Sequence, residues 1–105
     1  MLYGAAKRRA KKRGIPFSIT RDHILHLMEI QGFRCAVTGK EFCLESKNTF
    51  VNPWSPSLDQ ISPGKGYTPE NIRVVAAIYN YARGEYEDEC LIELAKLLLN
   101  PLQEI

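Results

Sequence analysis

The chain has 105 residues, 45% of them hydrophobic and 25% charged, with a formal net charge of +2 at pH 7. This length suits a single domain with one modest core. No segment approaches the roughly 18 consecutive apolar residues of a membrane span, and the charged N-terminus lacks the apolar run of a signal peptide. We therefore expect a soluble, cytoplasmic protein with no membrane partner.

The chain begins with a basic segment, residues 1–14. Its sequence KRRAKKR holds six of the fourteen Lys and Arg residues, while the other residues carry eight basic and twelve acidic groups. The residues up to Gly14 are good helix formers and a glycine commonly ends a helix, so we predict a short basic helix or arm. Its cations are Lys7, Arg8, Arg9, Lys11, Lys12 and Arg13.

The next segments predict an extended stretch, a helix and a hairpin. IPFSI is expected to be extended, because a proline disfavours helix at the residue before it. Thr20 is the candidate N-cap of an amphipathic helix over residues 21–31 that ends at Gly32. The segment FRCAVTGKEFCLE, residues 33–45, alternates around a turn, so we predict a β-hairpin there.

The remaining segments predict a strand followed by two helices. Residues 46–56 are rich in proline and asparagine and predict a loop, from which Phe50 and Trp54 pack onto the core. SLDQI is a short strand, SPGKGYTPEN a turn-rich loop, and IRVVAAIYNYARG begins apolar and then acquires helical spacing. EYEDECLIELAKLLLNPL predicts an amphipathic helix. Residues 15–105 thus predict one α+β domain.

Polar residues around this strand and the following helix suit cleavage of phosphodiesters with one metal ion. Such a site needs oxygen ligands for a hard cation such as Mg²⁺ or Mn²⁺ and a base that activates water. Asp59 and Asn80 are the candidate metal ligands, and Asn71 is a candidate brace for the loop. Structural interpretations are also open: Asp59 could cap the turn, and Asn80 could lie on an open helix face.

The segments CAVTG, PSLDQI, GYTPENIRVV and the asparagine of IYNYARG resemble the HNH, or His-Me finger, endonuclease superfamily, and within it small phage-type HNH-like proteins. This resemblance covers nearly the whole chain. It implies a ββα-metal core with an N-terminal basic helix, a helix before the hairpin and a C-terminal amphipathic helix. It also implies that Asp59 and Asn80 bind the metal and that Asn71 braces the catalytic loop.

Gln60 stands where the superfamily has its general-base histidine. A neutral amide can orient water but cannot accept its proton, and a positioned base typically contributes roughly 10²- to 10⁴-fold to the rate. The resemblance implies that phage-type members often lack this histidine too, so Gln60 is either a subfamily feature or a loss. His23 and His26 are the only histidines, and both have a structural interpretation at the rim of a helix.

The cysteines Cys35, Cys43 and Cys90 include no C-x-x-C pair, which fits a reducing compartment. Many HNH proteins hold a structural zinc through two such pairs. Here four tetrahedral ligands cannot be assembled from neighbouring residues, so we expect no structural zinc. We expect the hydrophobic core, including Phe42, Trp54 and the last helix, to substitute for it.

We therefore predict a divalent-metal-dependent HNH-type endonuclease that is encoded by a phage and acts on nucleic acid, with DNA as the favoured substrate. The alternative is a catalytically degenerate HNH-fold protein that binds nucleic acid or a protein partner without cutting; the oligomeric state is open. The basic segment would bind phosphates by counterion release, although a charge run can also be merely solvated. Lys65, Arg73 and Arg83 are further candidate phosphate contacts beside the site.

Overall fold

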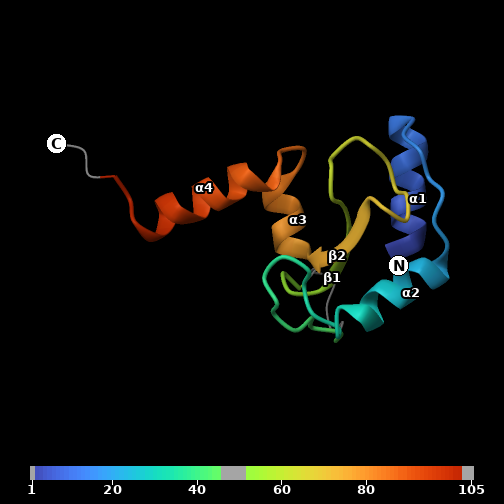
Figure 1. Cartoon of the computed structure of the whole chain (residues 1–105), viewed down its shortest axis with the longest axis horizontal. Coiled ribbons are helices and arrows are strands. Elements are labelled where there is room, and N and C mark those ends of the chain that lie inside the picture. The colour runs from blue at the N-terminus through green and yellow to red at the C-terminus, as the bar shows by residue number, and fades with distance from the viewer. Residues whose placement is uncertain (1, 46–51, 103–105) are drawn as a thin grey trace.

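The computed structural model describes residues 2–45 and 52–102, which form an α+β fold of four helices and a two-stranded sheet (Figure 1). This confirms the predicted α+β class, and the ββα-metal core stays a prediction. No helix in the described part of the chain is long and apolar enough to cross a membrane. In chain order the elements are α1 (Leu2–Arg13), α2 (Arg21–Ile30), β1 (Pro56–Gln60), β2 (Ile72–Ala76), α3 (Ala77–Arg83) and α4 (Asp88–Leu99).

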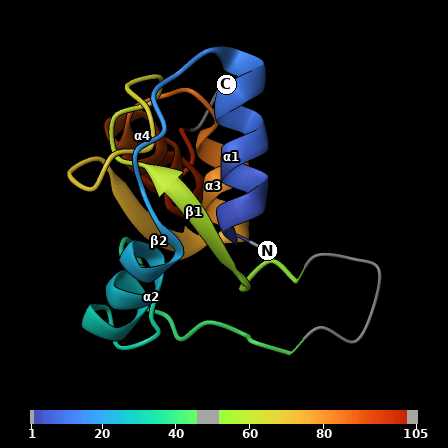
Figure 2. The same cartoon turned by 90° about the vertical axis from the view of Figure 1, so that its right-hand side faces the viewer.

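The sheet is an antiparallel hairpin of β1 and β2, joined by the loop of residues 61–71. In its register Leu58 lies opposite Val74 and Asp59 lies opposite Arg73. Because side chains alternate between the two faces of a strand, these pairs lie on opposite faces. Leu58 and Val74 join the core with α1 and α2, whereas α3 covers the face with Asp59 and Arg73 (Figure 2).

The prediction of a β-hairpin over residues 33–45 is wrong, because, in this described segment, neither arm forms a strand. Within the described residues its two arms meet only at an isolated antiparallel bridge between Arg34 and Glu41. The turn between them is formed, but the N–H of Ala36 donates to the carbonyl of Val74 in β2 at 3.0 Å. The arms exchange two backbone hydrogen bonds, from Cys35 N–H to the carbonyl of Lys40 and from Phe42 N–H to that of Phe33. The described segment therefore forms one bridge beside β2 and no pair of strands.

α2 begins at the predicted cap and ends on the outer edge of the sheet. The hydroxyl of Thr20 accepts the N–H of His23, and Nδ1 of His23 accepts the N–H of Thr20, which is a reciprocal capping box. Just after the helix, the side-chain amide of Gln31 both donates to and accepts from the backbone of Val74. Gln31 thus pairs with the free edge of β2 as a neighbouring strand would.

The basic segment is a helix packed on the body. Ala6 and Ala10, four residues apart and therefore on one face, are 0% and 1% exposed. Side chains this small let the backbone of α1 approach the sheet closely. The opposite side of α1 carries exposed cations: Lys7, Arg8, Lys11 and Lys12.

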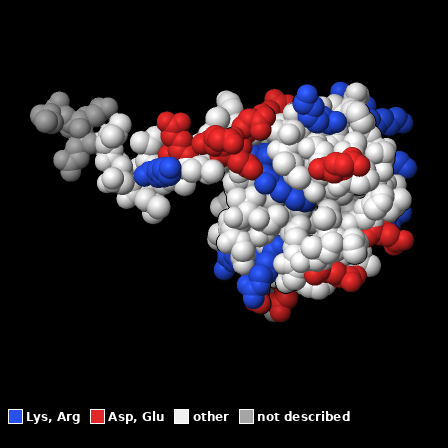
Figure 3. Space-filling model, viewed as in Figure 1, with Lys and Arg blue, Asp and Glu red and all other residues white. Residues whose placement is uncertain are grey.

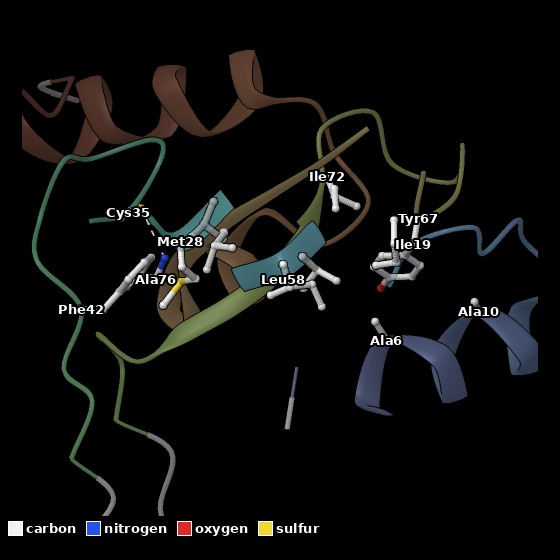
Figure 4. Packing of buried hydrophobic residues seen from close by; sticks show 13 residues of the cluster. Ala6, Ala10, Ile19, Met28, Cys35, Phe42, Leu58, Tyr67, Ile72 and Ala76 are labelled. Atoms are coloured by element: carbon white, nitrogen blue, oxygen red, sulfur yellow. Dashed lines mark hydrogen bonds between the residues drawn. The ribbon is translucent and has the colours of Figure 1, made fainter. Parts of the chain in front are cut away.

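The core extends along the sheet on both sides of Leu58 (Figure 4). Phe42 belongs to it, as predicted, but Trp54 does not, because this residue is 38% exposed. Trp54 lies in the turn before β1, where the ammonium of Lys40 covers its ring at 5.1 Å from the centroid. Phe50 lies outside the described residues.

α4 is a helix, as predicted, but the expectation that it completes the core is wrong. None of its residues is buried, although large apolar side chains such as Leu98 and Leu99 lie along it. Figure 1 shows that it extends away from the body beyond α3. It is tied to the body at its first turn, through Asp88.

Candidate functional site

Asp59 lies in a buried ion-pair network between β1, β2 and α3, with only 1% of its side chain exposed. Its Oδ1 accepts a hydrogen bond from Nη2 of Arg83 at 2.7 Å, and its Oδ2 accepts one from Nε of Arg73 at 2.8 Å. The register of the sheet sets Arg73 directly opposite Asp59, and α3 brings Arg83 over the same face. Each carboxylate oxygen is therefore bound by a guanidinium group.

Arg83 is itself buried, with 2% of its side chain exposed. Besides Asp59, it donates to the carbonyl of Gln60 at 2.7 Å and to that of Ile61 at 3.2 Å. Its Nε is buried without a partner among the described residues. A guanidinium inside a protein needs its charge and its donors compensated, and these contacts explain why an arginine can end α3 in the interior.

Asp88, in the first turn of α4, is the second acid of the network. Its Oδ1 accepts hydrogen bonds from Arg73 at 2.8 Å, from Arg83 at 3.3 Å and from the hydroxyl of Tyr79. The bond from Arg73 is the largest cause that lowers the pKa of Asp88 to about 2, and burial together with the bond to Asp88 raises the pKa of Tyr79 to about 12. Two acids and two arginines thus join α4 to the sheet with balanced formal charge.

Gln60 and Asn71 brace the Gly-rich loop. Oε1 of Gln60 accepts the N–H of Gly66 at 2.8 Å. Asn71 accepts the N–H of Ser62 and donates to the carbonyls of Ser62 and Gly66. Gly66 has φ +104°, and a Cβ there would meet Pro16 at 2.8 Å, so the brace holds the loop where only glycine fits. The side chain of Gln60 therefore has a structural task.

Asn80 lies on α3 and binds β1. Its Nδ2 donates to Oγ of Ser57 at 2.8 Å and to the carbonyl of Leu58 at 3.1 Å. The amide is thereby held beside the strand that carries Asp59, through hydrogen bonds to the residues that precede this carboxylate.

A cavity of about 650 Å³ is lined by three of the four predicted catalytic residues: Asp59, Gln60 and Asn80. Residues of β1, the loop and α3 line it, and α1 adds Arg9 and Arg13 to the lining. The basic helix therefore lines the same hollow as the predicted site, although Arg13 and Asp59 are 46 positions apart in the sequence.

The other predicted residues around this site are divided between the cavity and its surroundings. Arg83 lines the cavity, whereas Asn71, Arg73 and the exposed Lys65 are not part of its lining. Neither histidine reaches it: His23 caps α2, and His26 is exposed on that helix.

The arrangement around Asp59 is a poor fit for a divalent ion. Both carboxylate oxygens hold guanidinium groups, so two positive charges lie where a cation would bind. Burial raises the pKa of Asp59 above its ordinary value, against the opposing effect of Arg73 and Arg83. In the part of the chain that the structure describes, no three His, Cys, Asp or Glu residues gather as a metal site. The expected Mg²⁺ or Mn²⁺ site stays a prediction.

No protein-family model, no curated protein and no solved structure matches this chain. The resemblance to the HNH superfamily therefore depends on the motifs of the chain itself.

Sequence reasoning missed three residues of this region: Ser57, Tyr81 and Asp88. Ser57 and Tyr81 line the cavity, and Asp88 completes the ion-pair network. An acid in the first turn of a helix is common because it complements the helix dipole, so nothing local marked Asp88 as a partner of two arginines. Alternation along β1 could have placed Ser57 on the face of Asp59.

We expect Asp59→Asn to lower the free energy of unfolding by about 3–5 kcal/mol, because it leaves Arg73 and Arg83 with Asp88 as their one remaining counter-charge among the described residues. The matched control is Glu41→Gln, which breaks the exposed pair with Arg34 and should cost less than about 1 kcal/mol. Urea denaturation of both variants measures the two costs. Similar small costs would show that the buried pair is not a major source of stability.

The stabilising effect of Asp88 should depend on pH. Its pKa in the folded state, about 2, lies below its ordinary value of 3.8. Ionised Asp88 therefore stabilises the fold by about 2 kcal/mol above about pH 4, and this contribution is lost as the pH falls to about 2. The difference in unfolding free energy between the native chain and Asp88→Asn should shrink over that range. A difference that stays constant would contradict the network.

Proposed function

We propose that this chain is an HNH-like nucleic-acid-binding protein in which the β1–loop–β2–α3 unit is a ββα core that has become a structural support. Nucleic acid binds along the basic face of α1 and at the cavity beside it. Asp59, Gln60 and Asn71 hold the core together in this proposal, and hydrolysis is not their task.

The observation that carries this proposal is the rigid presentation of positive charge by α1. The helix is anchored by the buried Ala6 and Ala10, so its cations project from a fixed surface. Figure 3 shows basic side chains along the edge of the molecule where α1 lies, and acidic side chains gathered where α4 leaves the body. Charge separated in this way favours a polyanion at one end of the molecule, because phosphate contacts dominate nucleic-acid affinity.

The residues at the predicted catalytic positions support binding without cleavage. Asp59 is held by two arginines, and the amide oxygen of Gln60 accepts the N–H of Gly66. A base must lie within hydrogen-bond reach of the water that it activates, and neither histidine of the chain lines this cavity.

Cleavage is the second candidate function, and one observation favours it: Asp59, Gln60 and Asn80 do line a common cavity together with arginines. Its test is the nicking of supercoiled plasmid with Mg²⁺ or Mn²⁺ and with EDTA. We expect no nicking by the native chain. Metal-dependent nicking that Asn80→Ala removes would establish the second candidate and replace the first.

Binding should weaken with salt in proportion to the phosphates that α1 contacts. Replacing the exposed Lys7, Arg8, Lys11 and Lys12 by Gln should reduce the slope of log K against log salt by about 0.7–0.9 for each lost contact. Fluorescence anisotropy with labelled DNA at several salt concentrations measures this slope. The control is Lys96→Gln on α4, which should leave it unchanged. Equal slopes for the native chain and the fourfold variant would contradict a role of α1.

A further inference from the structure

The cavity beside α1 has the size of a site for one small ligand. Its volume of about 650 Å³ lies within the roughly 300–1,000 Å³ of pockets that enclose small organic molecules. In a duplex the bases are stacked and paired inside the helix, so a base enters a hollow of this size only after it has left the stack. The volume therefore suits a nucleotide of an unpaired strand.

The charges at the cavity favour a phosphate group. Arg9 and Arg13 line it from α1, and within the described residues neither forms an ion pair. The Nε of Arg9 donates to the buried hydroxyl of Tyr67 at 3.1 Å, which fixes where this guanidinium lies. The lining holds three arginines and two carboxylates, Asp59 and Glu85, so it keeps a net positive charge, and α1 contributes Arg9 and Arg13 to it.

An aromatic side chain lines the same cavity from α3. Tyr81 is 74% exposed, so the face of its ring is accessible to a ligand in the cavity. Base–aromatic stacking tolerates any sequence, because every base has a π-face. Exposed cations on one side and an exposed ring on the other are the combination that binds unpaired strands.

We propose that the cavity receives one nucleotide of a single-stranded nucleic acid, with its phosphate at Arg9 and Arg13 and its base against Tyr81. This inference rests on the proposed function and adds to it a preference for unpaired strands.

The test compares two fluorescein-labelled probes by anisotropy at the same salt concentration. One is an oligothymidylate of about 12 nucleotides, within the roughly 4–16 nucleotides that single-strand binding folds cover, and the other is a DNA duplex of equal length. We expect the single strand to bind more tightly. Tyr81→Ala should weaken its binding about five- to a hundredfold and leave duplex binding nearly unchanged.

Two matched controls separate the cavity from the general surface. Tyr86→Ala removes an exposed tyrosine that does not line the cavity, and it should leave both affinities unchanged. Lys12→Gln and Arg13→Gln each remove one exposed charge from the last turn of α1, but only Arg13 lines the cavity. Lys12→Gln should weaken both probes equally, whereas Arg13→Gln should weaken the single strand more.

Equal affinity for the two probes, or equal effects of Tyr81→Ala and Tyr86→Ala on the single strand, would overturn this inference and leave nucleic-acid binding by α1 intact. Binding of neither probe would overturn the proposed function and the inference together.

Discussion

The buried pair of Asp59 and Arg83 is the interaction on which the arrangement of β1, β2, α3 and α4 depends. Removing two charges from water is costly, and their attraction offsets that cost only when geometry and hydrogen bonding are nearly complete. Here both carboxylate oxygens are bound, and Arg83 also reaches two backbone carbonyls at the end of β1. The pair therefore dictates where α3 lies on the sheet, and Asp88 extends the same constraint to the start of α4.

The cavity is a consequence of this arrangement. With α3 fixed over one face of the sheet and α1 packed through its alanines on the other side of β1, residues of both helices line the hollow at the end of the strand. Gln60 and Asn71 keep the Gly-rich loop in place beside it. A network that neutralises its own charge leaves Arg9 and Arg13 as the cations that a ligand meets.

Local sequence patterns predicted those elements whose signals are themselves local. The basic helix, the Thr20 cap and the strand around Asp59 are examples, because helix formers, a capping residue and turn residues act within a few positions. The sequence patterns did not predict the boundary between β2 and α3, because one apolar run continues from the strand into the helix. The hairpin at residues 33–45 failed because alternation cannot show that Ala36 bonds to β2.

Long-range pairing could not be predicted in the same way. Arg83 is 24 residues from Asp59 in sequence, and both types are normally exposed, so composition gave no reason to expect them together inside. Asp59, Gln60 and Asn80, which the motif marked as candidate site residues, line one cavity. The motif could not show that the carboxylate is bound by arginines, because that depends on how α3 crosses the sheet.

Two arginines hold the carboxylate of Asp59, and their charges oppose the binding of a divalent ion at the same oxygens. Titrating Mn²⁺ into ¹⁵N-labelled protein tests this opposition most directly, because a paramagnetic ion broadens the NMR signals of nearby nuclei. We expect the signals of Asp59, Asn80 and the Nε–H of Arg73 to broaden no more than those of exposed acids such as Glu93 on α4. Selective loss of the Asp59 and Asn80 signals, at concentrations that leave Glu93 unaffected, would contradict this expectation.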